Sequence, residues 1–106
     1  MARHTVTIEI DGKKLSYDKH CVHVDQGDEI TWRVKDARPF AVIVKAFVSP
    51  LDWGHAVKEK DRKGVVGTVR ADAAPGFYPY GVCIGDGSGL IVDDPEIIVK
   101  PPKDRR

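Results

Sequence analysis

Short segments in which apolar and polar residues alternate, each followed by a turn signal, set the strongest limit on how this chain can fold. In residues 5–10 the alternation predicts a strand with its aliphatic side chains on one face. A second segment, residues 20–24, leads into the turn-forming pair Gly27-Asp28. Because turn signals recur about every eight to twelve residues, the pattern favours a β-sandwich or a barrel.

Further strands are predicted at residues 30–34, 40–48, 65–69, 77–84, 90–92 and 97–99. Residues 40–48 are nearly all apolar, so we expect that strand to be covered on both faces. After it, Ser49 as a cap, Pro50 at the first helical position and Asp52 in the first turn predict a short helix near residues 50–56. The chain should therefore be an all-β Greek-key sandwich of about seven strands. We expect a single domain over residues 1–100, followed by a polar tail at residues 101–106.

The inward faces of these strands define a predicted core of aliphatic and aromatic side chains: Val22, Val24, Ile30, Trp32, Val42, Tyr78, Tyr80 and Val82. One of the two tyrosines is expected to form a tyrosine corner, with its hydroxyl bonded to nearby backbone. Trp53 is expected to cap one end of the sandwich. The alternative is an exposed apolar patch made of Trp53, Phe77 and Pro79.

Charge and composition exclude several classes of function. With 17 basic and 16 acidic residues the formal net charge is +1, which argues against a strongly basic nucleic-acid binder. The longest apolar run, residues 40–44, is too short to cross a bilayer, so no membrane association is expected. The first ten residues hold no signal-like apolar stretch, which predicts a cytoplasmic chain as written, or a periplasmic or secreted one if a leader was removed. No phosphate loop or nucleophile elbow is present, so we do not expect an enzyme.

Three segments match one family in type and order. They are residues 22–32 (VHVDQGDEITW), residues 39–42 (PFAV) and residues 76–82 (GFYPYGV). The first resembles the second strand, turn and third strand of the cupredoxins, the small blue-copper sandwiches. The third resembles their Gly-x-Tyr-x-Tyr-x-Cys strand, which leads into the copper loop. The resemblance covers most of residues 5–99 and implies the cupredoxin fold.

The copper ligands of that family are missing at the corresponding positions. The resemblance places Phe40 where the first histidine ligand stands and Val82 where the cysteine stands. The single methionine is Met1, and no histidine follows His55, so the late loop supplies no second imidazole. A blue-copper site needs two imidazoles and one thiolate. We therefore predict a cupredoxin-like binding or accessory module with no type 1 copper site and no cofactor. Its partner is unknown, and we expect it to be a protein.

A metal-binding or electron-transfer protein with a non-standard site is the first alternative, with copper as its cofactor. The candidate ligands are His20, Cys21, His23 and Cys83. On a strand, Cys21 and His23 point to the same side, but a metal ion needs a third and a fourth ligand. Surface histidines with ordinary roles are the competing interpretation.

An immunoglobulin-like interaction domain is the second alternative. Cys21, Trp32 and Cys83 follow the order of the cysteine, tryptophan and cysteine of that fold, although Gly81 stands where its tyrosine is expected. A disulfide between the two cysteines would stabilise the chain by about 4 kcal/mol on the chain-entropy model. We expect two free thiols instead, both pointing away from the interior of the sandwich.

Overall fold

Ten β-strands make up the part of the chain that the computed structural model describes, which is residues 2–11, 14–35, 40–46, 48–54, 56–58, 64–85, 90–92 and 95–101. The strands are β1 (Arg3–Asp11), β2 (Lys14–Tyr17), β3 (Cys21–Val24), β4 (Glu29–Val34), β5 (Phe40–Val44), β6 (Ala56–Lys58), β7 (Val65–Thr68), β8 (Gly76–Gly85), β9 (Leu90–Val92) and β10 (Glu96–Val99). The all-β prediction is confirmed.

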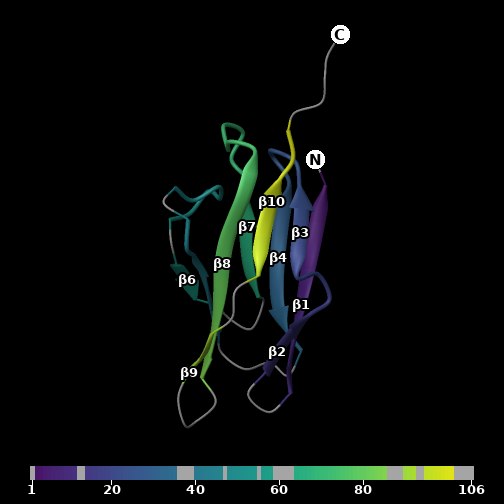
Figure 1. The fold of residues 1–106 in the computed structure, drawn as a ribbon, viewed down its shortest axis with the longest axis vertical. Coiled ribbons are helices and arrows are strands. Elements are labelled where there is room, and N and C mark those ends of the chain that lie inside the picture. The colour runs from purple at the N-terminus through teal and green to yellow at the C-terminus, as the bar shows by residue number, and fades with distance from the viewer. Residues whose placement is uncertain are drawn as a thin grey trace.

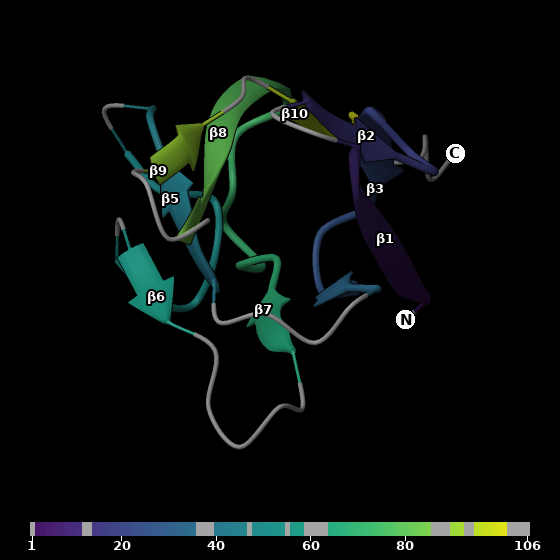
Figure 2. The same cartoon turned by 90° about the horizontal axis from the view of Figure 1, so that it is seen from below.

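The strands form two mixed sheets that pack face to face. The first, which we call the β4 sheet, has the order β2-β1-β4-β7. The second, the β8 sheet, has the order β3-β10-β8-β5-β6, and β9 also pairs with β8. The pairs β1–β4 and β3–β10 are parallel, and the others are antiparallel. In Figure 1, β8 and β10 lie in front of β4 and β7, and the view from below in Figure 2 shows the strands around a common interior.

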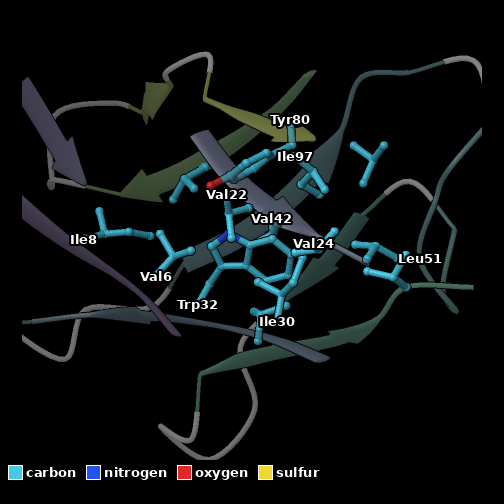
Figure 3. Packing of buried hydrophobic residues seen from close by; sticks show 14 of the residues in the cluster. Val6, Ile8, Val22, Val24, Ile30, Trp32, Val42, Leu51, Tyr80 and Ile97 are labelled. Atoms are coloured by element: carbon cyan, nitrogen blue, oxygen red, sulfur yellow. The ribbon is translucent and has the colours of Figure 1, made fainter. Parts of the chain in front are cut away.

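The core fills the space between the two sheets. Alternate residues of β3, β4, β5 and β10 are buried, as their period of two predicts. Trp32 is fully buried and contacts Tyr80 edge to face, with ring centroids 5.4 Å apart. Figure 3 shows its indole in the middle of the aliphatic side chains, among them Ile30 and Val42. Each side chain buried in this way contributes about 1.5–3 kcal/mol to folding.

The predicted core is confirmed except at Tyr78, which is partly buried near the start of β8. The Tyr78 hydroxyl donates a hydrogen bond to the carbonyl of Ala74, four residues upstream. This is the backbone contact that the predicted tyrosine corner requires.

The predicted helix near residues 50–56 is wrong: none of the described residues is helical, and residues 56–58 form β6. Ser49 does accept a hydrogen bond from the Leu51 N–H, at 3.2 Å, as a capping residue would. The Asp52 N–H, however, donates to the carbonyl of Thr68 in β7, and the Asp52 carboxylate accepts a hydrogen bond from the Thr68 N–H; both are 2.9 Å long. Leu51 forms a β-bridge with Val69. These contacts cover the free edge of β7, and they hold the segment in an extended conformation instead of a helix.

Two smaller predictions differ from the structure. The strand predicted for residues 40–48 ends at Val44, and its second face, at Ala41 and Ile43, is half-buried rather than covered. The short strands β2 and β6 raise the number of strands above seven, because both are too short or too polar to show a clear alternation. Residues 102–106, most of the predicted polar tail, lie outside the described residues.

Candidate functional site

The two positions that correspond to copper ligands lie side by side in the sandwich and are filled with apolar side chains. β5 pairs with β8 so that Phe40 faces Ile84 and Val42 faces Val82. Phe40 and Val82 are thus diagonal neighbours on one face of the sheet. Phe40 is 4% exposed, and the other three are fully buried. We call these four side chains, Phe40, Val42, Val82 and Ile84, the apolar plug. None of them carries a nitrogen, sulfur or carboxylate group that could bind a metal ion.

Cys21 lies at the start of β3 on the outer face of the β8 sheet. Its Sγ donates a hydrogen bond to Glu96 Oε1 at 3.7 Å and lies 3.8 Å from Nδ1 of His20. Desolvation by neighbouring groups, together with the hydrogen bond and the negative charge of Glu96, raises the pKa of the Cys21 thiol. The thiol is therefore protonated and weakly nucleophilic at neutral pH.

The four predicted ligands do not form one site. His23 is exposed on the same face as Cys21, whereas Cys83 lies on β8, with β10 between the two strands. Cys21 pairs with Glu96 and Glu96 with Pro79, four residues before Cys83. Two strand spacings and four residues along the strand separate the cysteines by about 16 Å. Among the described residues, no group of three or more His, Cys, Asp or Glu side chains is placed to hold a metal ion.

The same geometry decides the state of the two cysteines. Both thiols are free, as predicted, because about 7 Å between Cα atoms is the limit for a disulfide. Cys21 is exposed and Cys83 half-buried, so neither occupies the core. The immunoglobulin-like interpretation required its two cysteines to join the two sheets. It does not hold, since both cysteines lie in the β8 sheet.

A buried carboxylate that the sequence analysis did not single out ties the N-terminal strand to the turn before β4. Asp28 accepts hydrogen bonds from the N–H groups of Ala2 (2.9 Å) and Asp25 (3.0 Å) and lies 2.8 Å from Nε2 of His4. Burial alone would raise its pKa, but these hydrogen bonds and the electrostatic attraction to His4 outweigh it and lower the pKa of Asp28 to about 2. The Gly27-Asp28 turn motif was its sequence signal, and its role is structural.

A cleft of about 460 Å³ opens beside Trp53, between the segment at residues 48–54 and Arg70. Its charged side chains already have partners. Asp52 accepts the Thr68 N–H, and Arg70 makes a two-pronged ion pair with Asp72 at 2.9 and 2.8 Å. Polar groups that converge on a ligand are the usual sign of a small-molecule site, and this cleft does not present them.

Of the predicted apolar patch, two members lie on the outer face of the β8 sheet. Phe77 is 70% exposed, and Pro79 is also exposed. Trp53 is not part of it: its indole N–H donates to the carbonyl of Val66 at 2.9 Å, and its ring contacts Trp32. Trp53 therefore caps the sandwich, as the first interpretation predicted, and Phe77 remains as an exposed aromatic side chain on a sheet face.

Comparison with solved structures identifies the fold of this chain. A pseudoazurin from Sinorhizobium meliloti superposes with a TM-score of 0.60 over 96% of this chain and 76% of that one, at 20% sequence identity. An amicyanin mutant in its reduced state gives a TM-score of 0.55 over 91% of this chain and 82% of that one, at 21% identity. The Cu(I) form of a second amicyanin mutant gives 0.56, with the same coverage, at 22% identity. These three are cupredoxins, and the chain has the cupredoxin fold.

The likeness lies in the fold. No family model and no curated protein sequence matches the chain. The described residues include no helix long and apolar enough to span a membrane. The fold predicted from the three sequence segments is confirmed, and the two positions matched to copper ligands hold the buried apolar side chains of Phe40 and Val82.

Proposed function

We propose that this chain is a copper-free cupredoxin-fold module that works by binding another protein through its surface. The observation that carries the proposal is the apolar plug. Phe40 and Val82 occupy the positions of two copper ligands and are packed against Ile84 and Val42. Buried apolar side chains in contact stabilise the fold, so this end of the sandwich needs no metal ion to hold it together.

The surface supports a binding role more than a catalytic one. The sequence carries no catalytic motif, and the cleft beside Trp53 has its charged groups already paired. Phe77, by contrast, exposes most of an aromatic side chain on a sheet face. Exposed aromatic groups of this kind are typical of protein interfaces. Cys21 and Cys83 are too far apart to form a disulfide, so their free thiols are compatible with both a reducing and an oxidising compartment.

Copper titration tests the proposal. Cu(II) is added to the purified full-length chain, and the visible spectrum is recorded. We expect no intense charge-transfer band in the red, because the apolar plug offers no thiolate and no imidazole. Cys21→Ser and Cys83→Ser serve as matched controls that remove one thiol each. An intense red band in the wild-type chain would overturn the proposal.

The same two serine variants show which cysteine is responsible for any weaker binding of copper. The Sγ of Cys21 and Nδ1 of His20, 3.8 Å apart, are two ligands that a thiophilic ion accepts, and this pair favours non-standard metal binding as a second candidate function. Absorbance that disappears in Cys21→Ser but persists in Cys83→Ser would favour that function. Because the pair is exposed and supplies two of the four ligands that a structural metal site needs, we expect weak binding there.

A further inference from the structure

The outer face of the β8 sheet carries an apolar centre between opposite charges. The register places Cys21, Glu96 and Pro79 in one row across β3, β10 and β8. The N–H of Lys45 donates to the carbonyl of Pro79 at 2.8 Å, so Lys45 continues this row on the other side of Pro79. Lys45 is exposed and follows Ala41 and Ile43 on the outward side of β5.

The neighbouring row supplies most of the apolar surface. Ile98 of β10 lies between His23 and Phe77. Phe77 is 70% exposed and Ile98 is half-buried. Phe77 and Pro79 follow each other on the outward side of β8, which Figure 1 shows in front of the β4 sheet. The centre of the face is therefore apolar along β8, with Glu96 about one strand spacing to one side and Lys45 about one strand spacing to the other.

This arrangement is self-complementary. Two copies of the face can pack on each other about a twofold axis that runs parallel to β8. This rotation keeps each residue at the same height along the strands and exchanges the β10 side of the face with the β5 side. Each Phe77 then meets the second Phe77, and each Glu96 lies opposite the Lys45 of the other copy. A twofold axis perpendicular to the strands would instead place each Glu96 opposite a Glu96 or an Ile98, which its charge disfavours.

We propose that the partner of this face is a second copy of the chain, joined by Phe77 and Pro79 at the centre and by two Glu96–Lys45 ion pairs. The inference rests on the proposed function, since it names the partner of the binding surface. Sheets that pack face to face lie about 10 Å apart, a gap that the long side chains of glutamate and lysine can bridge together. The apolar centre is smaller than the roughly 800 Å² per partner of a standard interface, so the dimer is a weak one.

Sedimentation equilibrium on the full chain tests the dimer. The apparent mass should rise from 11.7 kDa towards twice that value as the concentration increases into the range of about 0.1–1 mM. Glu96→Lys and Lys45→Glu should each weaken association about tenfold, because each places two like-charged pairs across the twofold axis. Lys35→Glu, an exposed change directly after β4, is the matched control and should associate like the wild-type chain.

An equimolar mixture of the two charge variants is the decisive measurement. In the mixed pair, the lysine introduced at position 96 of one copy would meet the glutamate introduced at position 45 of the other. The native Lys45 of the first copy would meet the native Glu96 of the second, so both contacts become attractive again. We expect the mixture to recover association to within about threefold of the wild-type chain. Thermal melts of each variant show that it is folded before it is scored.

Each outcome decides a separate point. A wild-type chain that stays at 11.7 kDa up to about 1 mM would overturn the dimer. Association that neither charge variant weakens would overturn this face as its interface. A mixture no better than the single variants would overturn the twofold pairing. The proposed function fails on a different result, the red copper band, so a monomer without that band would leave the proposed function standing with a different protein partner.

Discussion

Replacing Asp28 by asparagine should remove a pH-dependent part of the stability. The side chain is 5% exposed, and Asp28 is one of the few buried polar residues in the described part of the chain. Its carboxylate accepts hydrogen bonds from two backbone N–H groups. In Asp28→Asn one carboxylate oxygen is replaced by an NH₂ group, which is a donor and then faces a backbone N–H that is also a donor. The loss of a charge-assisted hydrogen bond and the unpaired donor together predict a cost of about 2–3 kcal/mol at pH 7.

The pKa of Asp28 sets the pH range of this effect. Its pKa falls from 3.8 in the unfolded chain to about 2 in the folded chain. A lowered carboxyl pKa stabilises the fold fully above about pH 4, and this contribution disappears as the pH falls from about 4 to 2. A shift of just under two pKa units corresponds to about 2 kcal/mol.

Urea unfolding at pH 7, 5, 3.5 and 2.5 measures this effect in the wild-type chain and in Asp28→Asn. The difference in unfolding free energy should be largest at pH 7 and 5 and should shrink towards pH 2.5. Exposed pairs such as Arg70–Asp72 titrate equally in both proteins and cancel in the difference. Two parallel pH profiles would refute the assignment of the lowered pKa to Asp28.

Three further substitutions test the packing of the sandwich. Trp32→Ala should lower the unfolding free energy by about 3–5 kcal/mol, measured by urea titration, because it empties the centre of the core. Gly64→Ala should cost about 1–3 kcal/mol, since φ is +86° and a Cβ would lie 2.4 Å from a backbone oxygen; Gly54→Ala, with open space around it, should be neutral in the same assay. The double variant Phe40→His with Val82→Cys should lower the melting temperature and should not give an intense blue copper spectrum, because the second imidazole is still missing. A strong blue band in that variant would show that another histidine is within reach.

The sequence predicted the inward faces of the strands well, since period-two alternation records burial directly. Val22, Val24, Ile30 and Trp32 are all buried as expected. The helix at residues 50–56 was mispredicted because its cap signals are local, while the competing interaction is not. Asp52 is hydrogen-bonded to Thr68, 16 residues away, and no pattern around Ser49 reveals that edge.

The candidate site divides in the same way. The apolar character of the two ligand positions, Phe40 and Val82, followed from aligning motifs along the chain, and the structure shows both side chains buried. The neighbours of Cys21 were not predictable, because they depend on strand order. β10 lies between β3 and β8, which brings Glu96 to Cys21 across 75 residues and keeps Cys83 away. Strand adjacency of this kind leaves no trace in the spacing of the residues.

Phe77 has no folding role that accounts for an aromatic side chain at its position. About 70% of it is exposed, so its burial contributes little to the stability of the monomer, unlike that of Trp32. Folding and association can therefore be separated at this one position. Phe77→Ser should leave the melting temperature of a dilute sample nearly unchanged and should weaken association at high concentration. A melting temperature that drops as far as in a core variant would place Phe77 in the fold and remove it from the interface.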